Sequence, residues 1–156
     1  MISRLNSLNI QRSVELILED DKEKLEELQL AQLWSGQDSE GNDLAPSYLN
    51  DPYFRTPEAA QRYSNWKDKI TPVDSRSDAY ADRKKGVPNL FITGYWYSGL
   101  KLDLTGRGFI NSSPLNPAIE AKYPKALGLN PKGRKYYIDT EMMRQLMFDI
   151  RVTLKV

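Results

Sequence analysis

The feature that most limits what this chain can fold into is the alternating segment at residues 100–105. Leu100, Leu102 and Leu104 are each followed by a polar residue, and this period of two is typical of a half-buried strand. Gly106 and Gly108 come next and can adopt the positive φ values that a hairpin turn needs. The sequence therefore predicts a β-hairpin at about residues 97–112 with its leucines facing a core.

The densest apolar and aromatic segment of the chain, residues 89–100, leads into this hairpin. Thr93 and Gly94 interrupt the segment, and we expect them to form a bend before the first strand. Trp96 follows within the same run and is expected to pack against the core. These three residues are the predicted structural centre of the chain.

Composition favours one domain, residues 1–156, with a single core. The chain has 156 residues, of which 40% are hydrophobic, and this length suits one ordinary domain. It carries 22 basic and 21 acidic residues, for a formal net charge of +1. A charge balance this even argues against a general binder of polyanions.

The chain lacks cysteine and histidine, which narrows the chemistry available to it. Disulfides, thiolate catalysis and cysteine metal sites are excluded, and the commonest general base is missing. Paired carboxylates such as Asp38 with Asp43, or Asp74 with Asp78, could still catalyse hydrolysis, but both pairs lie in segments of turn-type composition. Because no phosphate-binding loop, dinucleotide fingerprint or nucleophile elbow is present either, we expect no enzymatic activity, no cofactor and no metal.

No segment has the hydropathy of a membrane span. No run approaches the roughly 18 apolar residues that a spanning helix needs, and residues 1–8 do not resemble a signal peptide. We therefore expect a protein that does not enter membranes and that assembles in a cytosol.

Three segments have helical periodicity. Residues 10–33 show apolar positions at intervals of three, four or seven, although Asp20 and Asp21 interrupt the stripe, so one long helix or two shorter ones are both compatible. Thr56, Pro57 and Glu58 are typical of a helix start, and Pro72 closes the helix that follows. The last helix is expected to begin at Asp139 or Thr140 and run to the C-terminus, with residues 136–138 as a short strand before it.

Two loops invite a functional interpretation. Residues 34–44 predict a short hairpin, and a calcium loop is the alternative because Asp38, Glu40 and Asp43 lie close together; its Gly41 comes too early for an EF-hand. Residues 71–88 are predicted to form a mobile arm. Within this arm Arg83, Lys84 and Lys85 are the only compact basic cluster, which indicates a partner or DNA contact, or else a solvated loop.

Taken together, these patterns predict an α+β fold. A mainly antiparallel sheet of three or four strands, centred on the hairpin at about 97–112, is expected to pack against long N-terminal and C-terminal helices.

The layout of residues 10–155 resembles small tail-completion and head–tail connector (neck) proteins of tailed bacteriophages. In that family a Thr-Gly-x-Leu-x-x-Ser motif leads into the strands; here Thr93 and Gly94 are followed by Trp96 in place of the leucine, and Ser98 comes early. Residues 111–113, 122–123 and 127–129 are similar to proteins of this kind from phages of Bacteroidetes hosts.

The resemblance implies a virion structural protein, assembled in the host cytoplasm. It would be a homo-oligomeric ring subunit below the portal, contacting the portal or other neck and tail proteins, with DNA passing through the centre and possible non-specific contact to it. The alternative is a small intracellular adaptor or regulatory protein that binds one phage or host protein.

Overall fold

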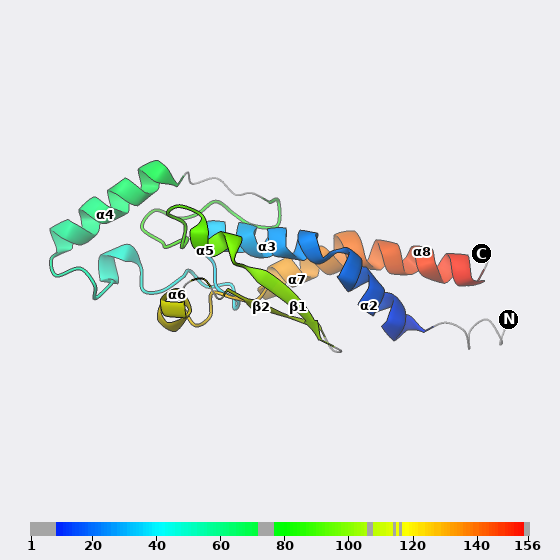
Figure 1. Cartoon of the computed structure of the whole chain (residues 1–156). Coiled ribbons are helices and arrows are strands. Elements are labelled where there is room, and N and C mark those ends of the chain that lie inside the picture. The colour runs from blue at the N-terminus through cyan, green and yellow to red at the C-terminus, as the bar shows by residue number, and fades with distance from the viewer. Residues whose placement is uncertain (1–8, 72–76, 106–107, 114, 116, 155–156) are drawn as a thin grey trace.

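The computed structural model describes residues 9–71, 77–105, 108–113, 115 and 117–154. Its elements in chain order are α2 (Ile10–Asp20), α3 (Lys22–Trp34), η1 (Tyr48–Asn50), α4 (Pro57–Ile70), α5 (Tyr95–Ser98), β1 (Lys101–Thr105), β2 (Gly108–Ser112), α6 (Pro117–Lys122), α7 (Pro131–Tyr137), η2 (Ile138–Met142) and α8 (Met143–Leu154). Figure 1 shows an elongated molecule with α3 in the middle, α4 at one end, and α2 and α8 at the other.

The prediction of an α+β fold with a sheet of three or four strands is wrong, because the protein is mainly helical. Within the described residues β1 pairs only with β2, antiparallel, with Leu102 opposite Asn111. The segment at 34–44 contributes an isolated bridge between Gln37 and Asp43, and residues 136–138 are helical. No further strand pairs with it among the described residues, so this small hairpin packs against the helices through Leu102 and is not the centre of a sheet.

The predicted long N-terminal helix is also absent, because the helix is interrupted at Asp21. Asp21 has φ −93° and ψ 12°, which separates α2 from α3. Its buried carboxylate accepts hydrogen bonds from the Tyr137 hydroxyl at 3.1 Å and the Gln145 amide at 2.7 Å, both from the C-terminal helices. Of the two arrangements compatible with the sequence, the structure therefore has two shorter helices, fixed by partners more than a hundred residues away.

The core surrounds α3, which is buried on several sides. Leu25 belongs to one cluster with Leu102 and Tyr137, and Leu33 belongs to a second with Trp96. Leu25, Leu33 and Leu102 each have 0% exposure, and burial of one such side chain stabilises the fold by about 1.5–3 kcal/mol. The hairpin thus presents Leu102 to the core, while Leu100 and Leu104 are half-buried.

Capping residues mark the starts of α4 and α7. The predicted start is confirmed for the first of these helices and wrong for the second. The start of α4 is confirmed: the Thr56 hydroxyl accepts from the Ala59 amide at 3.2 Å and Pro57 occupies the first helical position. The last helix starts earlier than predicted, since Asn130 caps α7 by accepting from the Gly133 amide at 2.8 Å. From Pro131 the chain stays helical through η2, a π-helical turn, to Leu154.

The segment predicted to be a mobile arm, residues 71–88, lies partly outside the described residues, at 72–76. Its remainder packs against the fold: Ala79, Tyr80 and Val87 are buried apolar side chains. The Gly86 carbonyl accepts from the Tyr48 amide at 3.0 Å. The described residues 77–88 therefore pack against the core through these side chains, while Lys84 and Lys85 remain exposed.

Candidate interaction surfaces

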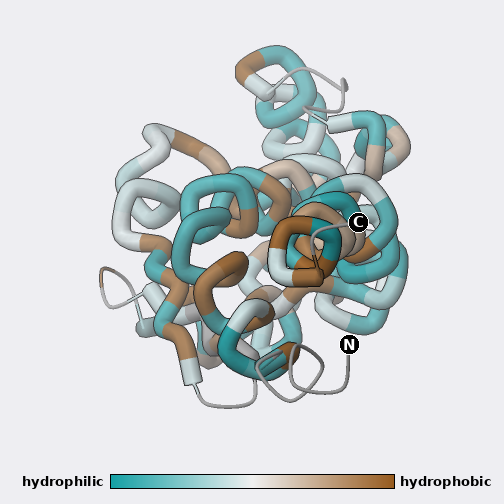
Figure 2. Tube along the Cα trace, turned by 90° about the vertical axis from the view of Figure 1, so that its right-hand side faces the viewer, coloured by the Kyte–Doolittle hydropathy of each residue, from teal (hydrophilic) through white to brown (hydrophobic). Residues whose placement is uncertain are grey.

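Within the described part of the chain, the C-terminal helix α8 has no fully buried side chain, and its Leu146, Ile150 and Leu154 are half-buried. Four of its large apolar residues are more than 40% exposed: Met143, Met147, Phe148 and Val152, which we call the α8 face. Phe148 is 66% exposed and Val152 is 59% exposed. Figure 2 looks onto this end of the molecule and shows hydrophobic stretches of tube beside the C-terminus.

The α8 face exists because the helix is anchored at its start and then packs only partly against α2. Asp21 binds Tyr137 and Gln145, and Lys24 forms an ion pair with Glu141 at 3.0 Å. These contacts fix the first turns of the continuous helix 131–154 against the junction of α2 and α3. Beyond Gln145 the helix lies alongside α2, and most of its apolar surface has no cover within the described part of the chain.

The opposite end of the molecule carries an aromatic groove with a volume of about 520 Å³. Its walls come from η1, α4, the segment before α5, and α6, and the lining includes Tyr48, Tyr53, Phe54, Tyr63, Ile92 and Tyr123. Tyr53 is 80% exposed and Ile92 is 53% exposed, so the rim is open to solvent. Tyrosine and apolar side chains of this kind are typical of protein interfaces.

Two lysines also line the aromatic groove. Lys122 pairs with the buried carboxylate of Asp51, and Lys67 is itself buried, with its ammonium donating to the Phe91 carbonyl. Burial, together with the nearby positive charge of Arg83, lowers the pKa of Lys67 to about 8. Burial also raises the pKa of Tyr48 and of Tyr123, so both hydroxyls stay neutral.

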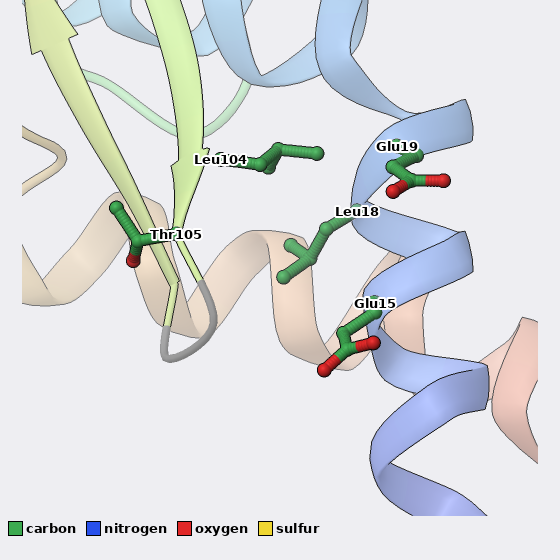
Figure 3. Close-up of a pocket in the computed structure, with 5 residues that line it drawn as sticks. All are labelled: Glu15, Leu18, Glu19, Leu104 and Thr105. Carbon is green, nitrogen blue, oxygen red and sulfur yellow. The ribbon is translucent and has the colours of Figure 1, made fainter.

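A smaller cleft of about 270 Å³ lies between α2 and β1. Figure 3 shows Leu18 of α2 and Leu104 of β1 pointing toward each other across it, with Glu15 and Glu19 on the α2 side. Glu15 pairs with Arg12 at 3.3 Å, whereas Glu19 forms no ion pair within the described part of the chain. The cleft is open to solvent, and Glu15 and Glu19 make its α2 side acidic.

The structure separates the predicted basic cluster. Arg83 is fully buried and donates to Asp68 at 2.6 Å, to the Val87 carbonyl at 2.8 Å and to the Thr71 carbonyl at 3.2 Å. Lys84 pairs with Asp43 at 2.8 Å on the surface, and Lys85 is exposed. Arg83 thus holds the fold together from inside, and only its two neighbours face solvent.

Thr93, Gly94 and Trp96 lie together at the start of α5. Gly94 has φ 81°, a left-handed conformation that suits glycine, and the Thr93 hydroxyl accepts from the Tyr95 amide at 3.3 Å. Trp96 is 4% exposed and belongs to the second core cluster.

The sequence analysis missed the α8 face. The signal was present, because the apolar residues at 143, 147, 148 and 152 are spread too widely around the helix to be buried by one narrow contact.

Within the described segments, side chains suited to holding a metal do not gather. No group of three or more acidic residues converges among the residues that the structure describes. In the loop considered for calcium, the Asp38 carboxylate accepts hydrogen bonds from the backbone amides of Glu40 at 2.9 Å and Asn42 at 2.8 Å, so this carboxylate stabilises the turn.

Among the described helices, none has the length and apolar character to span a membrane.

Comparison with protein-family models, with curated proteins and with solved structures finds no match to this chain.

Proposed function

We propose that this protein is a structural assembly subunit, which acts by binding copies of itself and neighbouring proteins. The observation that carries the proposal is the α8 face: Phe148 and Val152 are largely exposed, and α8 has no fully buried side chain within the described part of the chain. Most helical stability in proteins comes from packing an apolar face, and at the end of the continuous helix 131–154 Phe148 and Val152 lack such cover within the described part of the chain. A partner that covers Phe148 and Val152 supplies that packing.

The resemblance of residues 10–155 to phage neck proteins supports a specific kind of assembly. We propose a subunit of a head–tail connector or tail-completion ring below the portal of a tailed bacteriophage, located in the virion. An elongated chain with exposed apolar surfaces at both ends suits such a ring. DNA passing through the centre would meet Lys84 and Lys85, because Arg83 is enclosed.

The proposal is tested by the mass of the purified chain in solution. We expect sedimentation velocity and light scattering to show a discrete oligomer whose population rises with protein concentration. Phe148→Glu and Val152→Glu should each weaken association about 10-fold or more, since burial of one apolar side chain is worth about 1.5–3 kcal/mol.

Thr153→Glu is the matched control, because it adds the same charge at an exposed position beside Val152. It should leave association unchanged. A chain that stays monomeric at every concentration, or an oligomer that is indifferent to both α8 variants, would contradict the proposal.

The aromatic groove favours a second candidate, an adaptor that binds one phage or host protein. An apolar, tyrosine-lined groove of this size can receive an extended or helical segment of a partner. The adaptor is expected to remain a monomer or dimer when alone, and Tyr63→Ala in the groove wall should abolish partner binding without changing the mass of the free chain.

A further inference from the structure

One exposed helix face of this protein is acidic. Helical spacing places Leu16, Glu19 and Asp20 on the same side of α2, and all three are exposed. Leu16 is 42% exposed, so the surface is apolar at its centre as well as negatively charged. We call these three residues the α2 face.

The opposite end of the molecule has a helix face of the opposite sign. Arg62, Trp66, Lys69 and Ile70 lie on one side of α4 and form the α4 face. Trp66 is 43% exposed and Ile70 is 37% exposed. The Trp66 ring also contacts Tyr63 at 5.4 Å between centroids, which joins this face to the wall of the aromatic groove.

The charges of both faces are available for a partner. Within the described part of the chain, Glu19 and Asp20 form no ion pair, and neither do Arg62 and Lys69. Within the described residues the two faces therefore offer two unpaired negative and two unpaired positive charges around exposed apolar side chains. One turn earlier on the same helix sides lie Arg12, which pairs with Glu15, and Glu58. Complementary charge of this kind fixes orientation and excludes wrong partners.

The α2 and α4 faces cannot meet within one chain, because α2 and α4 lie at opposite ends of the molecule (Figure 1). We infer that the α2 face of one copy docks onto the α4 face of a second copy, head to tail. The inference rests on the proposed assembly function and adds the contact and its polarity. Because the two surfaces differ, the contact is heterologous, and its repetition gives a ring when the rotation between copies closes and a filament when it does not.

A second copy of this chain fits the observations better than a nucleic acid. The α2 face would repel phosphate, and the α4 face presents only two exposed cations on its own helix side. A second copy of the chain, by contrast, supplies a face of the opposite sign to each of these two faces.

Charge reversal tests the inference directly. Glu19→Arg and Arg62→Glu each place like charges opposite one another in a head-to-tail contact. We expect either variant alone to associate at least about 10-fold more weakly than the unmodified chain in sedimentation velocity. Circular dichroism should show that both variants keep the fold, since both positions are exposed.

Recovery of association in a mixture of the two variants then shows that the partner of each face is a second copy of the chain. In an equimolar mixture of the two variants, alternation of the copies places opposite charges at positions 19 and 62 of every contact, so association should return to within about 3-fold of the original. The double variant Glu19→Arg, Arg62→Glu should also assemble by itself, whatever the number of subunits. As controls, Glu27→Arg on α3 and Lys132→Glu on α7 change exposed charges outside both faces and should have no effect.

The outcomes separate this inference from the proposed function. If the unmodified chain is monomeric throughout, both fail. If it assembles but neither reversal weakens it, the head-to-tail contact is overturned and the assembly function stands. If the reversals weaken assembly without restoration in the mixture and in the double variant, the two faces do not bind each other, and the pairing is overturned.

Discussion

At the scale of single residues, the buried charges are the least expected feature of this protein. Arg83 is fully buried, and its guanidinium satisfies one carboxylate and two backbone carbonyls from separate segments. Lys67 lies nearby, with its ammonium on the Phe91 carbonyl. The buried ion pair of Arg83 with Asp68 is costly to break, because removal of one partner leaves the other groups desolvated and unsatisfied.

Arg83→Met is therefore expected to lower the free energy of unfolding by about 3–5 kcal/mol, because Asp68 and two carbonyls lose their donor. Urea denaturation followed by circular dichroism measures the change. Lys85→Met is the matched control within the same basic cluster, since Lys85 is exposed, and its effect should stay within about 0.5 kcal/mol. Equal effects for the two variants would show that Arg83 is not a structural residue.

Lys67 is expected to make stability depend on pH. Its pKa is about 8 in the fold against 10.5 for an ordinary lysine, so between these values the unfolded chain binds more protons than the folded one. Stability attributable to Lys67 should therefore rise as pH increases from about 8 to 10.5, and the buried charge should be destabilising below pH 8.

The measurement is the difference in unfolding free energy between the unmodified chain and Lys67→Met at several pH values from about 7 to about 10.5. The difference should change in favour of the unmodified chain as pH rises. A difference that is independent of pH would mean that Lys67 titrates as an exposed lysine does.

At the scale of elements, local signals predict α4 well and α7 poorly. The start of α4 depends on Thr56 and Pro57, which are adjacent in sequence, so the pattern alone predicts it. Asn130 and Pro131 carry the same signal for α7, but the glycine and tyrosines that follow favour turn or strand, and the pattern instead favours a helix start at Asp139 or Thr140. Asn130 is held by tertiary contacts, because its amide groups bind Gln32 and Gln37.

The junction at Asp21 is expected to control the position of α8. Asp21→Ala removes the acceptor for Tyr137 and Gln145, and should destabilise the fold by about 2–4 kcal/mol. Hydrogen exchange should rise in α8 more than in α4, because only α8 loses its anchor.

Asp21→Asn keeps one carbonyl acceptor at the same place and serves as the comparison. Its effect on exchange in α8 should be smaller than that of Asp21→Ala. If both variants leave exchange in α8 unchanged, the anchor lies elsewhere.

At the scale of the whole molecule, the chain is a rod with different surfaces at its two ends. The α8 face and the α2 face lie at one end, and the aromatic groove and the α4 face lie at the other (Figure 1). Neither end is covered within the described part of the chain. Under the proposed assembly function, a neighbouring subunit would cover each end.

Assembly is therefore expected to weaken with salt. Raising ionic strength from about 0.05 M to 0.5 M shortens the screening length several-fold and should reduce the contribution of the α2–α4 contact. The double variant Glu19→Gln, Arg62→Gln should associate more weakly at low salt and show a much flatter salt dependence. An association constant of the unmodified chain that does not change with salt would indicate that only the apolar α8 face holds the oligomer.

The sequence by itself determined the local features of this protein: the cap of α4, the alternation that places Leu102 inward, and the glycine bend at Gly94. Each depends on residues close together in the chain, whose steric and hydrogen-bonding preferences act over one or two turns. The tertiary structure alone decided that the hairpin has no third strand among the described residues, that the helix breaks at Asp21, and that Arg83 lies inside while α8 lies outside. These outcomes depend on partners far apart in the sequence, and burial of a charge or exposure of an apolar face is settled only when all the segments that compete for the same core are packed together.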